Sequence, residues 1–166
     1  MKEMLIRKAT VADAQSVFDI RIAAINSQCK GHYTPQDLEK WTTGTMSPDF
    51  VNMLEEKCYV AVVANVVVGT GMIDLRSGKI DAVFVMPTFM GKGIGRQMMN
   101  YLEQLAVEAG LSQISLEATL NAASFYKAVG FLGDKVSKYC SSSGLSLDCV
   151  LMVKDLPSCD KNKMRF

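Results

Sequence analysis

The sequence predicts an α+β fold: one mixed, mostly antiparallel sheet of about six or seven strands with helices on both faces. Three observations support this prediction. The 166 residues are enough for one domain with a sizeable core. Valine-rich runs of strand length alternate with segments of helical periodicity. No repeat or low-complexity linker separates them, so we expect one domain over residues 1–156 and a polar C-terminal tail at 157–166.

The first half of the chain predicts one strand, three helices and a strand hairpin, in that order. Residues 4–9 form the strand, and Thr10 then caps a helix in which Asp13 completes a capping box. Helices at 33–41 and 47–56 each begin with a threonine or serine cap followed by proline. Strands at 58–64 and 66–75 are joined like a hairpin at Asn65. The first helix has an apolar stripe of Val11, Ala14, Val17, Phe18, Ile22 and Ile25.

The second half continues the alternation. A turn at 76–79 leads to a strand at 80–86, which Pro87 stops. Apolar residues at helical spacing predict a helix over 94–109, ended by Gly110. A strand at 112–118, a short helix at 121–129 and a final hairpin of 131–140 with 145–153, turning at 141–144, complete the chain.

The composition is that of an ordinary globular protein. Hydrophobic residues make up 49%, charged residues 21%, and the net charge is +1, so nothing favours a nucleic-acid partner. The N-terminus lacks the apolar core of a signal peptide, and the apolar runs are too short to span a membrane. One histidine and no C-x-x-C pair argue against a metal site. We expect a cytoplasmic protein with free thiols at Cys29, Cys58, Cys140, Cys149 and Cys159.

A glycine-rich loop precedes the helix predicted at 94–109. Gly91, Gly93 and Gly95 leave the N–H groups of the helix start accessible, and a helix N-terminus favours an anion. Lys92 and Arg96 add positive charge, so the pattern predicts a phosphate site. The alternative is a helix entry turn that binds nothing. The spacing fits neither a P-loop nor a dinucleotide fingerprint.

The stretches "VFVMPTFMGKGIGRQMMNYLE", "EATLNAASFYKAVGF" and "HYTPQDLEKW" together resemble GNAT-type N-acetyltransferases, in particular a small bacterial single-domain subgroup. The resemblance covers roughly residues 4–153 and implies acetyl-CoA as co-substrate. It implies that Phe84 and Val85 pair with the pantetheine arm, and that Tyr126 contacts the cofactor and protonates the departing thiolate. The loop that would hold the pyrophosphate is Met90, Gly91, Lys92, Gly93, Ile94 and Gly95, followed by Arg96.

Two positions depart from the family pattern. Met90 stands where the family has glutamine or arginine, so a side-chain contact is lost while the backbone loop remains. Thr119 stands where the family often has asparagine, and we expect it to contact the cofactor. Asn121, two positions later, either contacts the cofactor or caps the following helix.

The resemblance predicts transfer of an acetyl group to a primary amine, of a small molecule in our interpretation, by direct attack in a ternary complex. Alternatives are a protein or peptide N-acetyltransferase, a non-catalytic acyl-CoA sensor, and an oxidoreductase with Glu117 on a dinucleotide ribose. Tyr126 has the alternative role of a core residue. Cys140 and Cys149 lack a histidine partner for nucleophilic catalysis. A homodimer is also left open.

The acceptor side is predicted from aromatic and acidic residues. His32, Tyr33 and Trp41 lie in the region that lines the acceptor pocket in the family, and they either surround a cationic amine or pack a helix on the sheet. His32 and Glu117 are candidate bases.

A two-residue turn at 77–78 would place Asp74 directly opposite Asp81, raise the pKa of one of them, and make Asp81 the base. Asp81 would then share a face with Val83 and Val85. In the alternative, Arg76 and Lys79 neutralise the pair, or a longer turn separates the aspartates.

Overall fold

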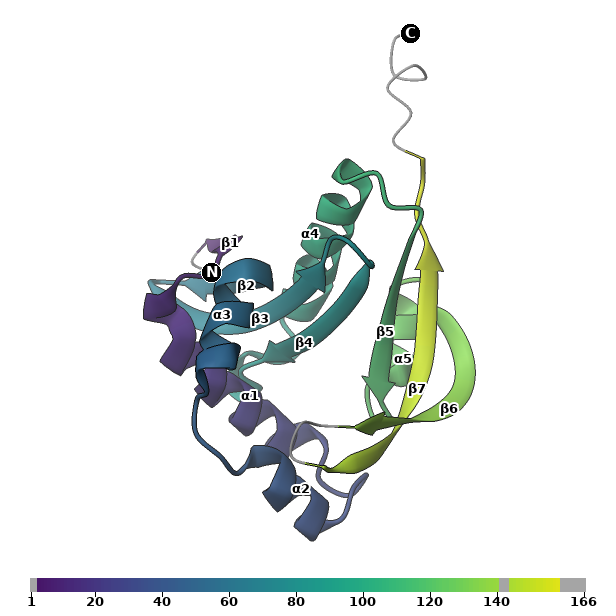
Figure 1. The fold of residues 1–166 in the computed structure, drawn as a ribbon. Coiled ribbons are helices and arrows are strands. Elements are labelled where there is room, and N and C mark those ends of the chain that lie inside the picture. Colours follow the sequence, from purple (N-terminus) through teal and green to yellow (C-terminus); the bar gives the residue numbers. More distant parts are fainter. Residues whose placement is uncertain (1–2, 141–143, 159–166) are drawn as a thin grey trace, which may run out of the picture.

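The computed structural model of the chain describes residues 3–140 and 144–158. Within these residues, one seven-stranded sheet has the order β1-β2-β3-β4-β5-β7-β6 and carries helices on both faces (Figure 1). The predicted α+β fold class is confirmed. Most of the turn expected at 141–144, most of the tail expected at 157–166, and Cys159 lie outside the described residues. No helix in the described part is long and apolar enough to cross a membrane.

The elements follow the predicted order. The first half contains β1 (Met4–Lys8), the 3₁₀ turn η1 (Val11–Asp13), α1 (Ala14–Gln28), α2 (Pro35–Thr42), α3 (Pro48–Lys57), β2 (Cys58–Val63) and β3 (Val66–Asp74). The second half contains β4 (Lys79–Val85), the 3₁₀ turn η2 (Pro87–Phe89), α4 (Ile94–Glu108), β5 (Gln113–Thr119), α5 (Ala123–Ala128), β6 (Leu132–Cys140) and β7 (Ser146–Asp155).

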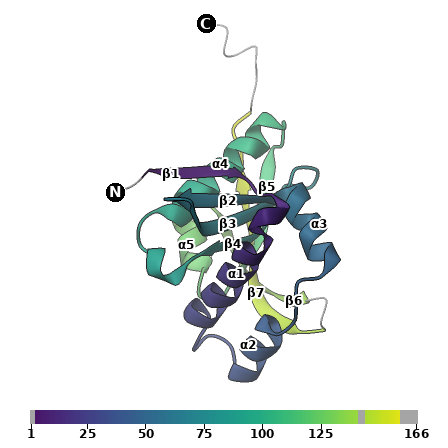
Figure 2. The same cartoon turned by 90° about the vertical axis from the view of Figure 1, so that its left-hand side faces the viewer.

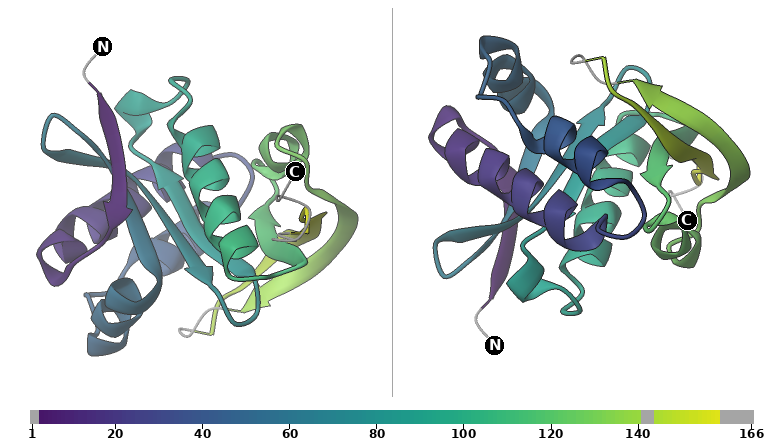
Figure 3. Two further views of the ribbon diagram at one scale, coloured as in Figure 1. Left: turned by 90° about the horizontal axis from the view of Figure 1, so that it is seen from above. Right: turned by 90° about the horizontal axis from the view of Figure 1, so that it is seen from below.

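Two apolar layers fix the helices on opposite faces of the sheet (Figure 3). The side chains of α4, among them Met98 and Leu102, pack with β3, β4 and β5 in one cluster. The buried side chains of α1 and α3, among them Val17 and Leu54, form the cluster on the other face. Gly71 is required in β3, because a Cβ there would lie 2.8 Å from the Cγ of Met98. Helix α4 therefore approaches the sheet closely.

Strands β4 and β5 touch at one end and then diverge (Figure 1). They pair in parallel at Lys79 and Ser115, where the N–H of Ser115 donates to the carbonyl of Gly78 at 3.0 Å. Beyond this pair, neither facing edge has a strand partner in the described residues. We call this diverging region, from Lys79 to Val85 and from Ser115 to Thr119, the β4–β5 splay. Its backbone groups are available to a ligand.

A bulge in β4 assigns its side chains to the two faces. Ala82 has φ +51°, and the hydroxyl of Thr70 donates to its carbonyl at 2.9 Å. Before the bulge, Asp81 lies opposite Met72, which packs in the cluster of α1. After the bulge, Val83 and Val85 pack in the cluster of α4. The prediction that Asp81 shares a face with Val83 and Val85 is therefore wrong, because the extra residue breaks the two-residue alternation.

The register between β3 and β4 also differs from the prediction. Asp74 lies opposite Lys79, and Met72 lies opposite Asp81. The turn contains residues 75–78 rather than two residues, because the carboxylate of Asp74 accepts from the N–H of Arg76 at 2.9 Å. Asp74 and Asp81 are therefore not a directly facing pair. Asp74 instead forms an ion pair with Lys57 at 3.2 Å.

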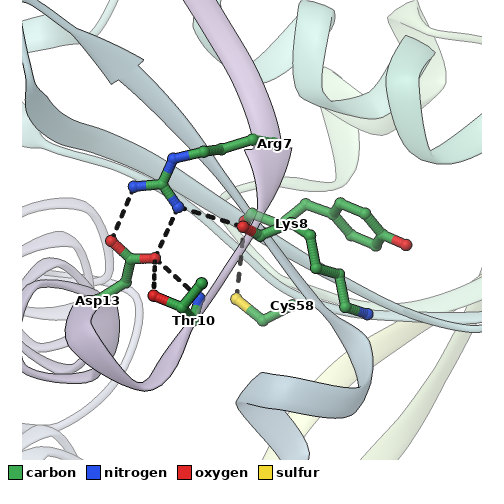
Figure 4. Close-up of polar contacts among 6 residues, drawn as sticks. Arg7, Lys8, Thr10, Asp13 and Cys58 are labelled. Atoms are coloured by element: carbon green, nitrogen blue, oxygen red, sulfur yellow. Dashed lines mark hydrogen bonds and ion pairs between the residues drawn. The ribbon is translucent and has the colours of Figure 1, made fainter.

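An ion pair fixes the connection between β1 and α1 (Figure 4). The guanidinium of Arg7 donates to both carboxylate oxygens of Asp13, at 2.7 and 3.0 Å. Asp13 also accepts from the N–H of Thr10 at 2.8 Å, so the predicted capping box is present. Arg7 is the main reason why the pKa of Asp13 lies below its usual range.

This ion pair predicts a pH-dependent loss of stability in Asp13→Asn. Because the pKa of Asp13 is lower in the folded state, its stabilisation is present above the unfolded-state pKa of about 3.9 and disappears as the pH falls through the folded value. We expect the variant to lower the free energy of unfolding by about 1 to 3 kcal/mol at pH 7 and by less at pH 3, measured by urea unfolding.

Asp19→Asn is the control, since Asp19 is exposed and, among the residues that the structure describes, its side chain bonds only Gln15 on the same helix. It should change stability by about 0.5 kcal/mol or less at pH 7. An equal loss at both pH values for Asp13→Asn would show that the charge of Asp13 contributes nothing.

Candidate functional site

The glycine-rich loop before α4 combines open space with free backbone N–H groups. Gly91 and Gly93 have φ values of +77° and +82°, and Gly93 is the N-cap of α4. A Cβ at either glycine would meet no atom within 4 Å, so the space beside them is open. In the described chain, the backbone N–H groups of residues 91–96 donate to no carbonyl. Free N–H groups and the positive end of a 15-residue helix favour a bound anion.

The flanking side chains differ in how they serve this loop. Lys92 and Arg96 are exposed beside it, and Lys92 lies 5.0 Å from the ring centre of Phe89. Gly95 does not open space for a ligand as the sequence predicts, because a Cβ there would lie 3.3 Å from the ring of Phe125. The sulfur of Met90 accepts from the amide of Gln28 at 3.2 Å, which ties the end of α1 to the loop.

The end of β4 presents a free backbone edge. The N–H of Met86 donates to the carbonyl of Val68 at 2.8 Å. Because alternate residues of an antiparallel strand face its partner, Phe84 faces β3, and the N–H and carbonyl of Val85 point into the splay. Of the two residues predicted to pair with pantetheine, Val85 therefore has the suitable orientation. The side chain of Phe84 packs in the cluster of α1 instead.

Tyr126 lies in the core between α5 and the splay. The residue is 9% exposed, and its ring makes edge contacts with Phe125 at 5.1 Å and Phe131 at 5.9 Å between ring centres. Burial raises the pKa of Tyr126 well above its usual value, and the charge of Asp81 adds to this. The two residues predicted to be catalytic thus lie close enough to interact electrostatically.

A charged cluster lies at the start of the splay. Lys79 of β4 and Glu117 of β5 form an ion pair at 2.7 Å. Asp81 follows Lys79 by two residues, and burial is the main cause of its raised pKa, although the residue remains open to water. Lys79 opposes this rise, Glu117 adds to it, and Asp74 adds least. The direction agrees with the sequence prediction, but the cause is the protein around Asp81 rather than a facing Asp74.

Thr119 and Asn121 lie beside the end of α1. Their side chains lower the pKa of the Cys29 thiol, which burial raises more strongly. Asn121 does not cap α5, because the N-cap is Ala122. Within the described residues, the amide oxygen of Asn121 is buried without a hydrogen-bond partner. Whether either residue contacts a cofactor remains a prediction.

The residues predicted to bind the acceptor do not all lie together. The hydroxyl of Tyr33 donates to the carbonyl of Asp148 at 2.6 Å and accepts from the N–H of Leu120 at 3.1 Å, so Tyr33 joins the α1–α2 connection to β5 and β7. Trp41 packs edge-on against Tyr33 at 5.8 Å. His32 is exposed in a surface groove of about 440 Å³ beside Tyr33, and no described contact links it with Asp81. Asp74 also lies outside the cluster, in its pair with Lys57.

Sequence reasoning missed Arg21, Tyr139 and the placement of Lys79. Arg21 lies in α1 and donates to the carbonyl of Trp41 at 3.0 Å. Tyr139 lies in β6, 6.5 Å from Trp41 between ring centres. The sequence contains a pattern that could have revealed Arg21. It is a charged residue four positions after Val17, so it lies on the same side of the helix as this buried residue.

The Cys149 thiol is not a candidate nucleophile. Cys149 is buried, its thiol donates to a carboxylate oxygen of Glu117 at 3.6 Å, and its pKa is raised to about 11, chiefly by burial. It is therefore protonated at neutral pH. Cys140 is exposed and unpaired by disulfide in the described chain.

Comparisons with known proteins agree with the predicted family. The family model described as "Acetyltransferase (GNAT) domain" matches residues 29–148. The uncharacterized N-acetyltransferase YafP of Escherichia coli is 24% identical over 131 residues, which are 79% of this chain and 83% of that protein.

Solved structures share the fold. A GCN5-related N-acetyltransferase from Rhodopseudomonas palustris has a TM-score of 0.86 at 24% identity, over 94% of this chain and 98% of that one. The PaiA N-acetyltransferase from Thermoplasma acidophilum, solved in complex with coenzyme A, has a TM-score of 0.71 at 19% identity, over 92% and 99% of the two chains.

The loop geometry predicts that Gly93→Ala weakens the binding of coenzyme A. The added Cβ would enter the open space beside the free N–H groups. We expect affinity to fall at least about tenfold, or about 1.4 kcal/mol, in isothermal titration with coenzyme A.

Gly110→Ala is a matched control. Gly110 has φ +82° at the opposite end of the α4 segment, and a Cβ there also meets no atom within 4 Å. Both variants carry the same backbone strain, so they should lose similar stability while only Gly93→Ala loses affinity. Equal affinity in the two variants would remove the loop from the anion site.

Proposed function

The chain belongs to the GNAT family of acetyltransferases, which use acetyl-CoA. We propose that it transfers the acetyl group to the primary amine of a small molecule, by direct attack in a ternary complex. The observation that carries the proposal is an arrangement along one strand. β4 has the charged cluster of Lys79, Asp81 and Glu117 at its start and leads to the anion-binding loop beyond its end.

The cofactor residues follow from this arrangement. The free N–H groups of residues 91–96 would bind the pyrophosphate, with Lys92 and Arg96 adding charge. The open backbone edge at Val85 would hydrogen-bond the amides of the pantetheine arm, as an added strand would. The bound acetyl-CoA supplies an activated thioester, and the direction of β4 would place that thioester near Asp81. Fixing the two reactants side by side is a large part of the rate enhancement.

Asp81 and Glu117 would attract the protonated amine and prepare it for attack. A carboxylate with a raised pKa is a stronger base than an ordinary aspartate, so Asp81 is the better proton acceptor. It would take the proton directly or through one water. Lys79 holds Glu117 in its ion pair, so Asp81 is the carboxylate of this cluster that takes part in no described salt bridge.

Tyr126 would stabilise the departing thiolate. Burial raises its pKa, so the phenol stays protonated over the whole physiological range. That pKa lies far above the thiol value of about 8.5, so proton transfer from the phenol to the thiolate is unfavourable. The hydroxyl would therefore stabilise the thiolate at least partly by donating a hydrogen bond.

The rings of Tyr33, Trp41 and Tyr139 form an aromatic group near the proposed acceptor site. They come from the α1–α2 connection, α2 and β6, and successive rings are in contact. Such rings would attract a cationic amine, and we propose that it belongs to a small molecule. A protein or peptide acceptor is the alternative, and a panel of free amines, amino acids and peptides that follows thiol release from acetyl-CoA separates the two.

The first test is Asp81→Asn with the best acceptor of that panel. The rate on the amine should rise with pH as Asp81 loses its proton, with an acidic limb above the usual aspartate pKa. The variant should lose turnover by about 10²-fold and lose that limb, with unchanged affinity for acetyl-CoA. Asp74→Asn, on the neighbouring strand but paired with Lys57, should keep both. A parental rate and pH profile in Asp81→Asn would show that another group is the base.

The second test is Tyr126→Phe, which keeps the ring packing and removes the hydroxyl. We expect turnover to fall by about 10²-fold while the dissociation constant for acetyl-CoA stays within error. Tyr101→Phe is the control, because Tyr101 contacts Tyr59 on β2, away from the splay. If both variants turn over like the parent protein, Tyr126 is a core residue and not part of the chemistry.

A further inference from the structure

Arg21 is a cation on the side of α1 that packs on the sheet. It follows buried Val17 by four residues and precedes buried Ala24 by three, so it shares their face of the helix. The residue is half-buried, and burial lowers its pKa. A guanidinium remains protonated in a protein, so the structure holds a partly desolvated positive charge here.

This charge has no counter-ion in the described residues. None of the ion pairs among residues 3–140 and 144–158 includes Arg21. Within the described part of the chain, its side chain donates to one acceptor, the carbonyl of Trp41 at 3.0 Å. A guanidinium carries five N–H donors and matches a carboxylate with two parallel hydrogen bonds. Burying a charge without a partner is costly, so an anion from outside the chain would stabilise the site.

Arg21 lies near the aromatic residues that would surround the acceptor, because it bonds the carbonyl of Trp41. Helix α2 lies beside α1 and near the end of the β6–β7 hairpin, as Figures 1 and 2 both show. This brings Tyr139 of β6 against Trp41 of α2. The charges of Asp81, Arg21, Glu117 and Lys79 all act on the Tyr139 phenol. Tyr139 thus lies among the acidic groups that would bind the amine and the cation of Arg21.

We propose that Arg21 binds a carboxylate of the acceptor, so that the substrate is a small amino acid-like molecule with its amine at Asp81 and its carboxylate at Arg21. The inference rests on the proposed acetyl transfer and names its acceptor class. Tyr139, whose ring contacts Trp41, would add an aromatic surface beside the acceptor. A protein N-terminus has a peptide amide where this acceptor has its anion, and a lysine side chain has methylene groups there, so neither uses the Arg21 charge.

The test is a binding measurement that needs no turnover. Trp41 is the single tryptophan of the chain, and its own carbonyl accepts from Arg21. Tryptophan fluorescence of the protein saturated with coenzyme A is followed during titration with the proteinogenic amino acids and with the amides of the same amino acids. The best amino acid should bind at least tenfold more tightly than its amide. Arg21→Gln should bring the two within threefold, and Arg21→Lys should keep part of the preference.

Arg76→Gln is the matched control, because the exposed Arg76 is also unpaired by any described ion pair but lies in the β3–β4 turn. It should keep the full preference. The same pairs are then compared as acceptors in thiol release, where Arg21→Gln should lower kcat/KM for the amino acid and leave that for its amide unchanged.

The two proposals fail in different ways. Amides that bind as well as amino acids, a preference that survives Arg21→Gln, or no saturable amino acid in the panel would overturn the role of Arg21, even if acetyl transfer to other amines is found. Carboxylate binding that depends on Arg21, without thiol release from any acceptor, would support the role of Arg21 and count against acetyl transfer.

Discussion

The rest of the site depends on one contact, the parallel pair between β4 and β5 at Lys79 and Ser115. It joins the two strands at one end only, with the Lys79–Glu117 ion pair beside it. A sheet that continued would satisfy the backbone groups of β4 and β5 internally. Because the strands diverge, the end of β4 keeps an open edge, and that edge leads to the glycine-rich loop at the start of α4. The fold thus leaves hydrogen-bonding capacity unused where a ligand can take it.

The bulge at Ala82 places the side chains before and after it on opposite faces of β4. Without it, Asp81 would lie on the same face as Val83 and Val85, in the apolar layer of α4. With it, Asp81 lies on the face of α1, where Arg21 also lies, while Val85 stays packed beneath α4. The hydroxyl of Thr70 bonds the carbonyl of Ala82, so a buried polar group in β3 supports the bulge in β4. The bulge would therefore separate the proposed cofactor side of the site from the proposed acceptor side within a single strand.

Features set by local sequence could be predicted, and features set by the partner strand could not. The caps at Thr34 and Ser47, the loop around Gly93 and the α+β order follow from short-range chemistry, and the structure has them. The turn at 75–78 was predicted two residues too short. The carboxylate of Asp74 accepts a hydrogen bond from the N–H of Arg76, which favours the longer turn. No pattern marks the bulge at Ala82, since its hydroxyl partner lies on another strand. The open edge of Val85 and the cluster around Tyr139 likewise require the sheet order and the packing of α2.

The most direct test of cofactor binding at the open edge of β4 is amide hydrogen exchange at Val85, compared with and without saturating acetyl-CoA. The N–H of Val85 points into the splay and should gain a hydrogen-bond partner, so its exchange should slow by at least about tenfold. Val60 of β2, which is paired on both sides by β1 and β3, should not change. Unchanged exchange at Val85 with acetyl-CoA bound would contradict the claim that the open edge of β4 binds the cofactor.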